Sequence, residues 1–153
     1  MGAGIWGSAF FAIFAVMIII SRPLVGKAYA RYGSKYIIYP GLVLFILGLL
    51  ALGIATTPLT IILTAPLLGL GYGAAQPAFQ ALAIQSAPIE RAGVSTATYF
   101  LALDISVGAG SVILALLASA VGYQYLYIFT AVIMIVALAL YHIWIKKYTP
   151  QEL

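Results

Sequence analysis

The sequence has no cysteine and few charged residues, and each of these features excludes a class of protein. Without cysteine, neither a disulfide framework nor a thiolate metal site can form. Only 7% of the residues are charged, whereas a soluble domain carries roughly a quarter. The basic residues form no cluster with interleaved aromatic rings, which argues against a nucleic-acid partner.

Apolar residues, in contrast, make up 65% of the chain and gather in five long blocks. A helix rises about 1.5 Å per residue, so it crosses a hydrocarbon core about 30 Å thick in about 20 residues. Membrane strands would alternate apolar and polar residues, and these blocks do not. The pattern predicts an all-α integral membrane protein in the lipid bilayer, a five-helix transmembrane bundle forming one domain over residues 1–153. The expected spans are 4–25, 36–55, 59–84, 93–121 and 125–145.

Basic residues fall only near alternate ends of these spans: at the end of the first span and after it, after the third span, and in the tail after the fifth. The positive-inside rule assigns such ends to the cytoplasm. We therefore expect a multi-pass protein of the plasma membrane, with its N-terminus outside and its C-terminus in the cytoplasm. No basic side chain precedes the first block, which is interpreted as a retained span and not a signal peptide. The seven residues are Arg22, Lys27, Arg31, Lys35, Arg91, Lys146 and Lys147.

Glycine and proline interrupt the third and fourth spans. The third holds Pro66, Pro77 and a Gly69–Gly73 GxxxG step with Gly71 between, and the fourth holds glycines at 108 and 110. Such residues let helices bend or approach one another closely. Tight packing is the favoured interpretation and a moving gate the alternative.

Polar side chains inside the spans are the functional candidates, because each needs a partner or a water-filled cavity. Asp104 is the only acidic one and lies near mid-depth in the fourth span. A carboxylate in hydrocarbon favours its protonated form, as proton coupling requires, but Asp104 could instead pair with a group on another helix. Four-residue spacing puts Gln76 and Gln80 on one helix face. We expect them to line a cavity with Tyr72 or to bond between helices.

The start of the fourth span is also polar, with Ser95, Thr96, Thr98 and Tyr99. These hydroxyls can face a cavity or bond back to their own helix. Asp104, Gln76, Gln80, Tyr72 and Tyr99 together form the predicted substrate or proton pathway.

A single histidine, His142, lies near the end of the last span. A metal site needs several ligands, and a serine nucleophile needs a base beside it; His142 supplies neither arrangement. We predict no enzyme, no metal and no other cofactor, and interpret His142 as an interfacial anchor.

The segment at and after the end of the first span reads RPLVGKAYARYGSK and begins at Arg22. Within it, Gly26 is followed five residues later by Arg31 and seven residues later by Gly33. This segment resembles the loop signature of the major facilitator superfamily, in which an acidic residue stands where this chain has Ala30. In that family the acidic residue helps latch the cytoplasmic ends of the helices. Ala30 has no charge and cannot make that contact here. By this likeness the five spans resemble helices eight to twelve, part of one major facilitator half.

The resemblance implies secondary active transport by alternating access. We expect efflux of small molecules, coupled to protons in an antiporter, by a C-terminal fragment of a larger transporter. Such a fragment would need a homo-oligomer or a complementary transporter half to complete its cavity. The alternative functions are a non-transporting membrane assembly subunit and an inactive transporter fragment.

Overall fold

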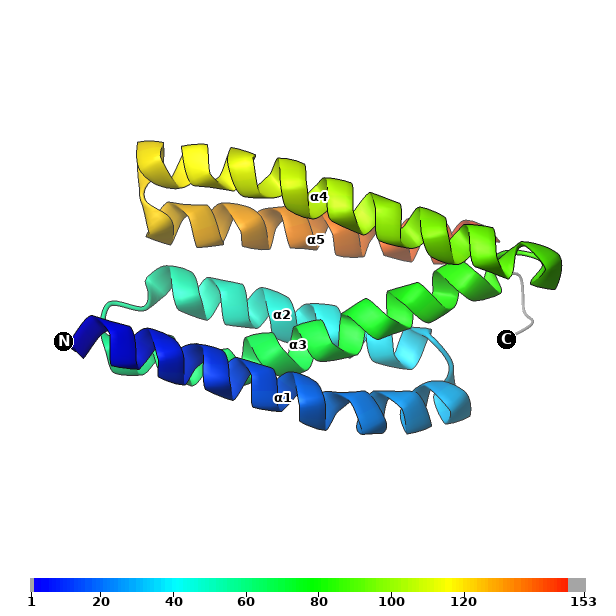
Figure 1. The fold of residues 1–153 in the computed structure, drawn as a ribbon, viewed down its shortest axis with the longest axis horizontal. Coiled ribbons are helices and arrows are strands. Elements are labelled where there is room, and N and C mark those ends of the chain that lie inside the picture. Colours follow the sequence, from blue (N-terminus) through cyan, green and yellow to red (C-terminus); the bar gives the residue numbers. More distant parts are fainter. Residues whose placement is uncertain (1, 149–153) are drawn as a thin grey trace.

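The computed structural model describes residues 2–148, and the side chains of residues 4–145. Within that range it contains five long helices and no strand (Figure 1). All five are long and apolar enough to cross a membrane, so the predicted all-α, five-helix transmembrane bundle is confirmed. The helices are α1 (Gly2–Tyr32), α2 (Lys35–Ile54), α3 (Pro58–Gln85), α4 (Ala92–Val121) and α5 (Tyr123–Tyr148), with a short 3-10 turn, η1 (Ile89–Arg91), before α4.

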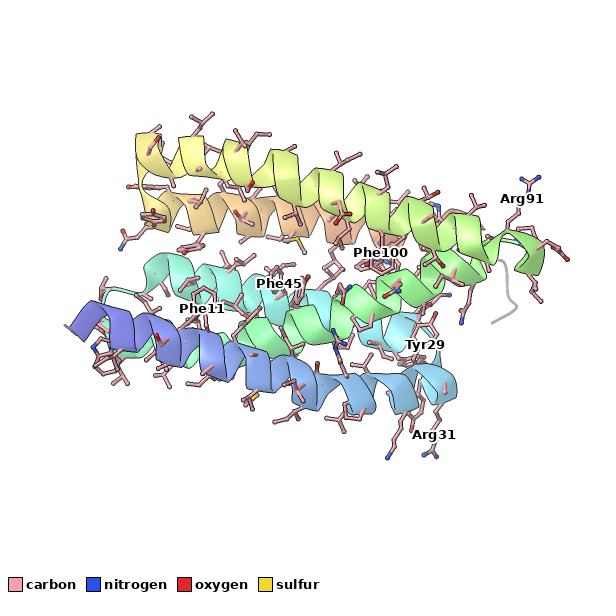
Figure 2. All side chains as sticks on the ribbon, in the orientation of Figure 1. Phe11, Tyr29, Arg31, Phe45, Arg91 and Phe100 are labelled. Carbon is pink, nitrogen blue, oxygen red and sulfur yellow. The ribbon has the colours of Figure 1, made fainter. Side chains whose placement is uncertain are left out.

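Successive helices run in opposite directions along the long axis of the bundle (Figure 1). The connections after α1 and α3 lie at one end, and those after α2 and α4 lie at the other. Arg31 and Arg91 both extend away from the bundle at the first of these ends (Figure 2). The side chains of Lys146 and Lys147, which the predicted orientation also used, lie outside the described range. We call the end with Arg31 and Arg91 the basic end.

The first connection is shorter than the sequence predicts. Helix α1 continues through Pro23 and Gly26 to Tyr32, and the expected basic turn is therefore wrong in extent. Four of the six residues from Lys27 to Tyr32 are lysine, arginine or alanine, which favour helix, so one glycine does not end the helix. The helix stops only at Gly33, whose φ of 83° is a left-handed value that glycine adopts without strain.

The second connection is fixed by a reciprocal cap. The Thr57 Oγ1 accepts a hydrogen bond from the Thr60 backbone N–H at 3.2 Å, and the Thr60 Oγ1 accepts one from the Thr57 N–H at 3.1 Å. Pro58 follows at the first helical position, where its missing N–H costs nothing. These groups begin α3 directly after a short turn.

Helix α3 packs closely against α1 on one side and α2 on the other. A Cβ on Gly69 would meet the Phe14 carbonyl oxygen of α1 at 2.7 Å, and one on Gly73 would collide with Ser21 of α1. A Cβ on Gly71 would meet the Phe45 backbone nitrogen of α2 at 2.5 Å. The GxxxG step thus faces α1, the glycine between faces α2, and the contacts agree with tight helix packing.

Helix α5 packs against the unit formed by α1, α2 and α3, mainly through α2. A buried cluster combines Ile38 and Leu42 of α2 with Ala78 of α3 and Tyr141 of α5. The Tyr39 hydroxyl and the His142 Nδ1 lie 2.7 Å apart within hydrogen-bonding distance. His142 therefore contacts a neighbouring helix, which its predicted anchor role did not include.

Helix α4 differs from the rest, because none of its residues is buried, although all its side chains are described. It contacts α3 near the basic end and runs beside α5 (Figure 1). Large apolar residues such as Leu101, Ile105 and Val112 are exposed along it. A membrane-spanning helix can present such a surface to lipid or to another protein.

Candidate functional site

A pocket of about 550 Å³ with both polar and apolar lining residues lies between α1, α3 and α4. Its polar lining residues are Arg22 and Tyr29 of α1 and Gln76 and Gln80 of α3. The remaining lining is apolar and includes Phe100, which Figure 2 labels between α4 and α3. Other lining residues are Val25, Gly26, Ala30, Pro77, Ala78 and Ala81.

Helical periodicity explains why these residues share one pocket. On α1 the lining positions Arg22, Val25, Gly26 and Tyr29 are spaced by three, four and seven residues from the first, so they form one helix face. On α3 the two glutamines are four residues apart, as predicted for one face. The structure therefore brings Gln76 and Gln80 together at a cavity.

Hydrogen bonds tie the three helices together around this pocket. The Tyr29 hydroxyl donates to the Gln85 Oε1 at 2.9 Å and links α1 to α3. The Tyr99 hydroxyl donates to the Gln76 carbonyl oxygen at 3.1 Å, and the Ser95 Oγ donates to the Ala83 carbonyl oxygen at 2.6 Å. These last two bonds attach the basic end of α4 to α3.

The other hydroxyls at the start of α4 bond to their own helix. The Thr96 Oγ1 donates to the Ala92 carbonyl oxygen at 2.8 Å, and the Thr98 Oγ1 donates to the Val94 carbonyl oxygen at 2.9 Å. Thr96 and Thr98 therefore follow the second alternative offered by the sequence, a bond back to their own helix. Only Ser95 and Tyr99 connect to another helix.

Tyr72 does not line the pocket with the glutamines. Its ring lies between Phe14 of α1 and Phe45 of α2, with centroid distances of 6.3 and 6.2 Å. Aromatic pairs at this separation stabilise helix contacts. The structure thus places Tyr72 in an aromatic cluster one turn away from Gln76.

Asp104 is exposed on α4. Among residues 4–145, no side chain forms a hydrogen bond or an ion pair with its carboxylate. It follows Phe100 by four residues, which places it on the same helix face and one turn farther from the basic end. Asp104 is not among the residues that line the pocket with Gln76, Gln80 and Arg22.

The residues of the predicted loop motif separate into two groups. Arg22 and Gly26 line the pocket, whereas Arg31 and Gly33 lie at the basic end of α1. The Arg31 guanidinium carbon lies 5.4 Å from the centroid of the Tyr32 ring. Arg31 is therefore held by a cation–π contact at the surface.

Sequence reasoning missed Arg22, Tyr29 and Phe100 as pocket residues. Arg22 was counted as a topology signal and as part of the loop motif, although a charge four residues before Gly26 on one helical face was visible in the sequence. Phe100 follows Tyr99 and carried no polar signal. In the part of the chain whose side chains are described, no three His, Asp or Glu residues are grouped to hold a metal ion.

Comparison with known proteins gives consistent matches along almost the whole chain. The family model described as Major Facilitator Superfamily matches residues 3–152. The chain is 30% identical over 149 residues to the "Uncharacterized MFS-type transporter YhhS" of Escherichia coli K12, covering 96% of this chain and 36% of that protein. It is 29% identical over 151 residues to the protein of that name in Salmonella typhimurium LT2, covering 97% of this chain and 37% of the relative. The chain spans about a third of the length of these curated relatives.

Proposed function

Because the chain belongs to the Major Facilitator Superfamily, we propose that it supplies five helices of a secondary transporter that exports small molecules across the plasma membrane by alternating access. Membership of this family supports small-molecule transport and a role other than that of an enzyme. The chain is a multi-pass membrane protein with five apolar helices. Efflux, the coupling ion and the assembly that completes the pathway belong to the proposal.

The observation that carries the proposal is the surface of α4. This helix buries none of its described residues within the chain, yet it carries Asp104 between apolar positions. An ionisable side chain at membrane depth is tolerated where it faces a cavity or a partner. We propose that this face of α4 completes a central pathway with another transporter segment and that Asp104 exchanges protons there.

The distribution of charge supports the proposed orientation. Arg31 and Arg91 lie at the same end of the bundle (Figure 2), and positive residues favour the cytoplasmic side. The basic end is then cytoplasmic, and the start of α1 is outside. The pocket at Arg22 opens toward the cytoplasmic half of the membrane in this orientation.

A second candidate is an assembly subunit that does not transport. The exposed apolar face of α4 also suits a partner helix in such a subunit. The GxxxG step of α3 gives this candidate no support, because α1 already occupies it. Transport measurements therefore separate the two candidates.

The test uses proteoliposomes that contain the protein in the oligomeric state or complex in which it is extracted from the membrane. The solutes are benzenesulfonate, choline and glucose, which represent an anion, a cation and a neutral molecule. An internal pH dye reports proton movement under an imposed pH gradient. We expect the internal pH to change faster in the presence of at least one of these solutes than it does in protein-free vesicles with the same solute.

The Asp104→Asn variant tests the proton role in the same vesicles. We expect it to keep solute exchange and to lose solute-driven proton movement, because an amide cannot release a proton. Unchanged proton movement would remove Asp104 from the mechanism. If none of the three solutes moves in vesicles that contain the protein, and crosslinking recovers a stable partner complex, the assembly subunit is supported instead.

A further inference from the structure

We infer that the pocket between α1, α3 and α4 binds a small organic anion, a monocarboxylate or sulfonate with an apolar body. This inference deepens the proposed function, since it names the substrate class of the same transporter. It rests on Arg22, on the two glutamine amides and on the apolar lining at Phe100. Each of these features contributes a separate part of the recognition.

The first feature is an unpaired cation. Arg22 is the only formally charged residue in the pocket lining, and no ion pair joins it to any other side chain of residues 4–145. The chain has only three acidic residues, so a matching anion is scarce within the protein. A guanidinium at membrane depth is stabilised by a counter-ion, and the planar donor fork matches a carboxylate or sulfonate.

The second feature is the pair of amides facing the same cavity. Gln76 and Gln80 are both half-buried and both line the pocket. A side-chain amide provides two N–H donors, which suit the remaining lone pairs of an oxyanion. The Gln76 backbone is held by Tyr99, so this wall of the pocket is fixed by α4.

The third feature is the apolar lining, which favours an organic anion over an inorganic one. Phe100, Val25 and Pro77 contribute apolar surface, and the cavity of about 550 Å³ is in the range of small-molecule sites. A bare phosphate would leave this surface in contact with water. An aromatic or aliphatic body would cover it.

The test measures binding of radiolabelled benzoate to the purified protein in detergent, with neutral benzamide as the isosteric competitor. We expect excess unlabelled benzoate to displace the label and benzamide to displace it at least about tenfold less well, because benzamide lacks the charge that Arg22 recognises. Equal competition by the two compounds would overturn the inference.

Variants locate the binding site. Arg22→Gln should weaken benzoate binding about tenfold or more, and Arg22→Lys should weaken it by a smaller factor because the charge stays but the planar fork is lost. Arg91→Gln removes the same charge at the basic end, outside the pocket lining, and should change affinity less than about twofold. If Arg22→Gln does not fold, Arg22→Lys still tests the site. Equal affinities for Arg22→Lys, Arg91→Gln and the unchanged protein would contradict the proposal.

A lipid phosphate is the other source of an anion at this depth. Short-chain phosphatidylglycerol is therefore added as a second competitor. If it displaces benzoate at lower concentrations than unlabelled benzoate does, the pocket is a lipid head-group site and the solute proposal is overturned.

This inference and the proposed function can fail separately. If choline or glucose is transported but benzoate binding does not depend on Arg22, the transporter proposal stands and the anion-site proposal is wrong. If benzoate binding depends on Arg22 but benzenesulfonate, choline and glucose are not transported, the anion-site proposal stands and the transporter proposal is wrong.

Discussion

In α3, glycine residues lie against the backbones of α1 and α2, whereas in α4 the glycines lie in open space. A Cβ added at Gly71 would meet backbone atoms within 2.8 Å, but one added at Gly108 or Gly110 would meet no atom of the described residues within 4 Å. The two helices have the same number of glycines, three each, and opposite surroundings. The difference indicates that α3 organises the fold of this chain, whereas α4 contacts α3 and α5 but leaves most of its surface for lipid or another protein.

Of the substitutions that test this comparison, Gly71→Ala should reduce the stability of the protein most. The new Cβ would lie 2.5 Å from the Phe45 backbone nitrogen, and backbone atoms of a helix cannot move aside without separating α2 from α3. We expect a loss of about 3 kcal/mol in the free energy of unfolding, measured by denaturant titration in mixed micelles. The matched change Gly108→Ala should leave stability unchanged or raise it, because alanine favours helix. Equal losses at both positions would break the comparison.

Gly73→Ala should have an intermediate effect, because its obstacle is a side chain. The Cβ would collide with the Ser21 Oγ, which donates a hydrogen bond to the Ile18 carbonyl oxygen. We expect a loss of about 1–2 kcal/mol in unfolding free energy. Combining it with Ser21→Ala should recover part of that loss, since the colliding oxygen is gone. A double-mutant cycle without coupling would show that the contact is not formed.

The attachment of α4 to α3 should be weaker than either glycine contact. Tyr99→Phe removes the hydrogen bond to the Gln76 carbonyl oxygen and should cost about 0.6 kcal/mol, a typical value for bonds between membrane helices. Thr98→Val removes only a bond within α4 and serves as the control. Crosslinking between α3 and α4 should fall for Tyr99→Phe alone. A similar fall in the control would mean that the tyrosine hydroxyl does not hold the two helices together.

Much of the fold could be predicted because the bilayer imposes simple requirements. Long apolar blocks must become helices in hydrocarbon, and the GxxxG spacing in α3 indicated close packing that the Phe14 and Ser21 contacts support. The end of α1 was predicted wrongly, because the basic segment after residue 25 was interpreted as a connection, whereas the helix continues to Tyr32. Local propensity decided that boundary.

The site was predictable only in part. Four-residue spacing placed Gln76 and Gln80 on one face, and both line the pocket. The role of Arg22 could not be derived, because its charge already had a topological explanation and its pocket depends on residues of α3 more than fifty positions away. The surroundings of Asp104 were equally beyond the sequence, since periodicity gives a depth and a face but no neighbour.

Asp104→Asn should have the smallest effect on stability of all these changes. The carboxylate is exposed and forms no hydrogen bond or ion pair within residues 4–145, so its replacement removes no internal contact. We expect the unfolding free energy to stay within about 0.5 kcal/mol of the unchanged protein, as for other exposed positions. The same denaturant titration measures it, and Ser106→Ala, which loses only a bond to its own helix at Ala102, is the matched control on α4. A loss comparable to that of Gly73→Ala would mean that Asp104 is paired inside the chain, and α4 would then belong to the packed unit with α3.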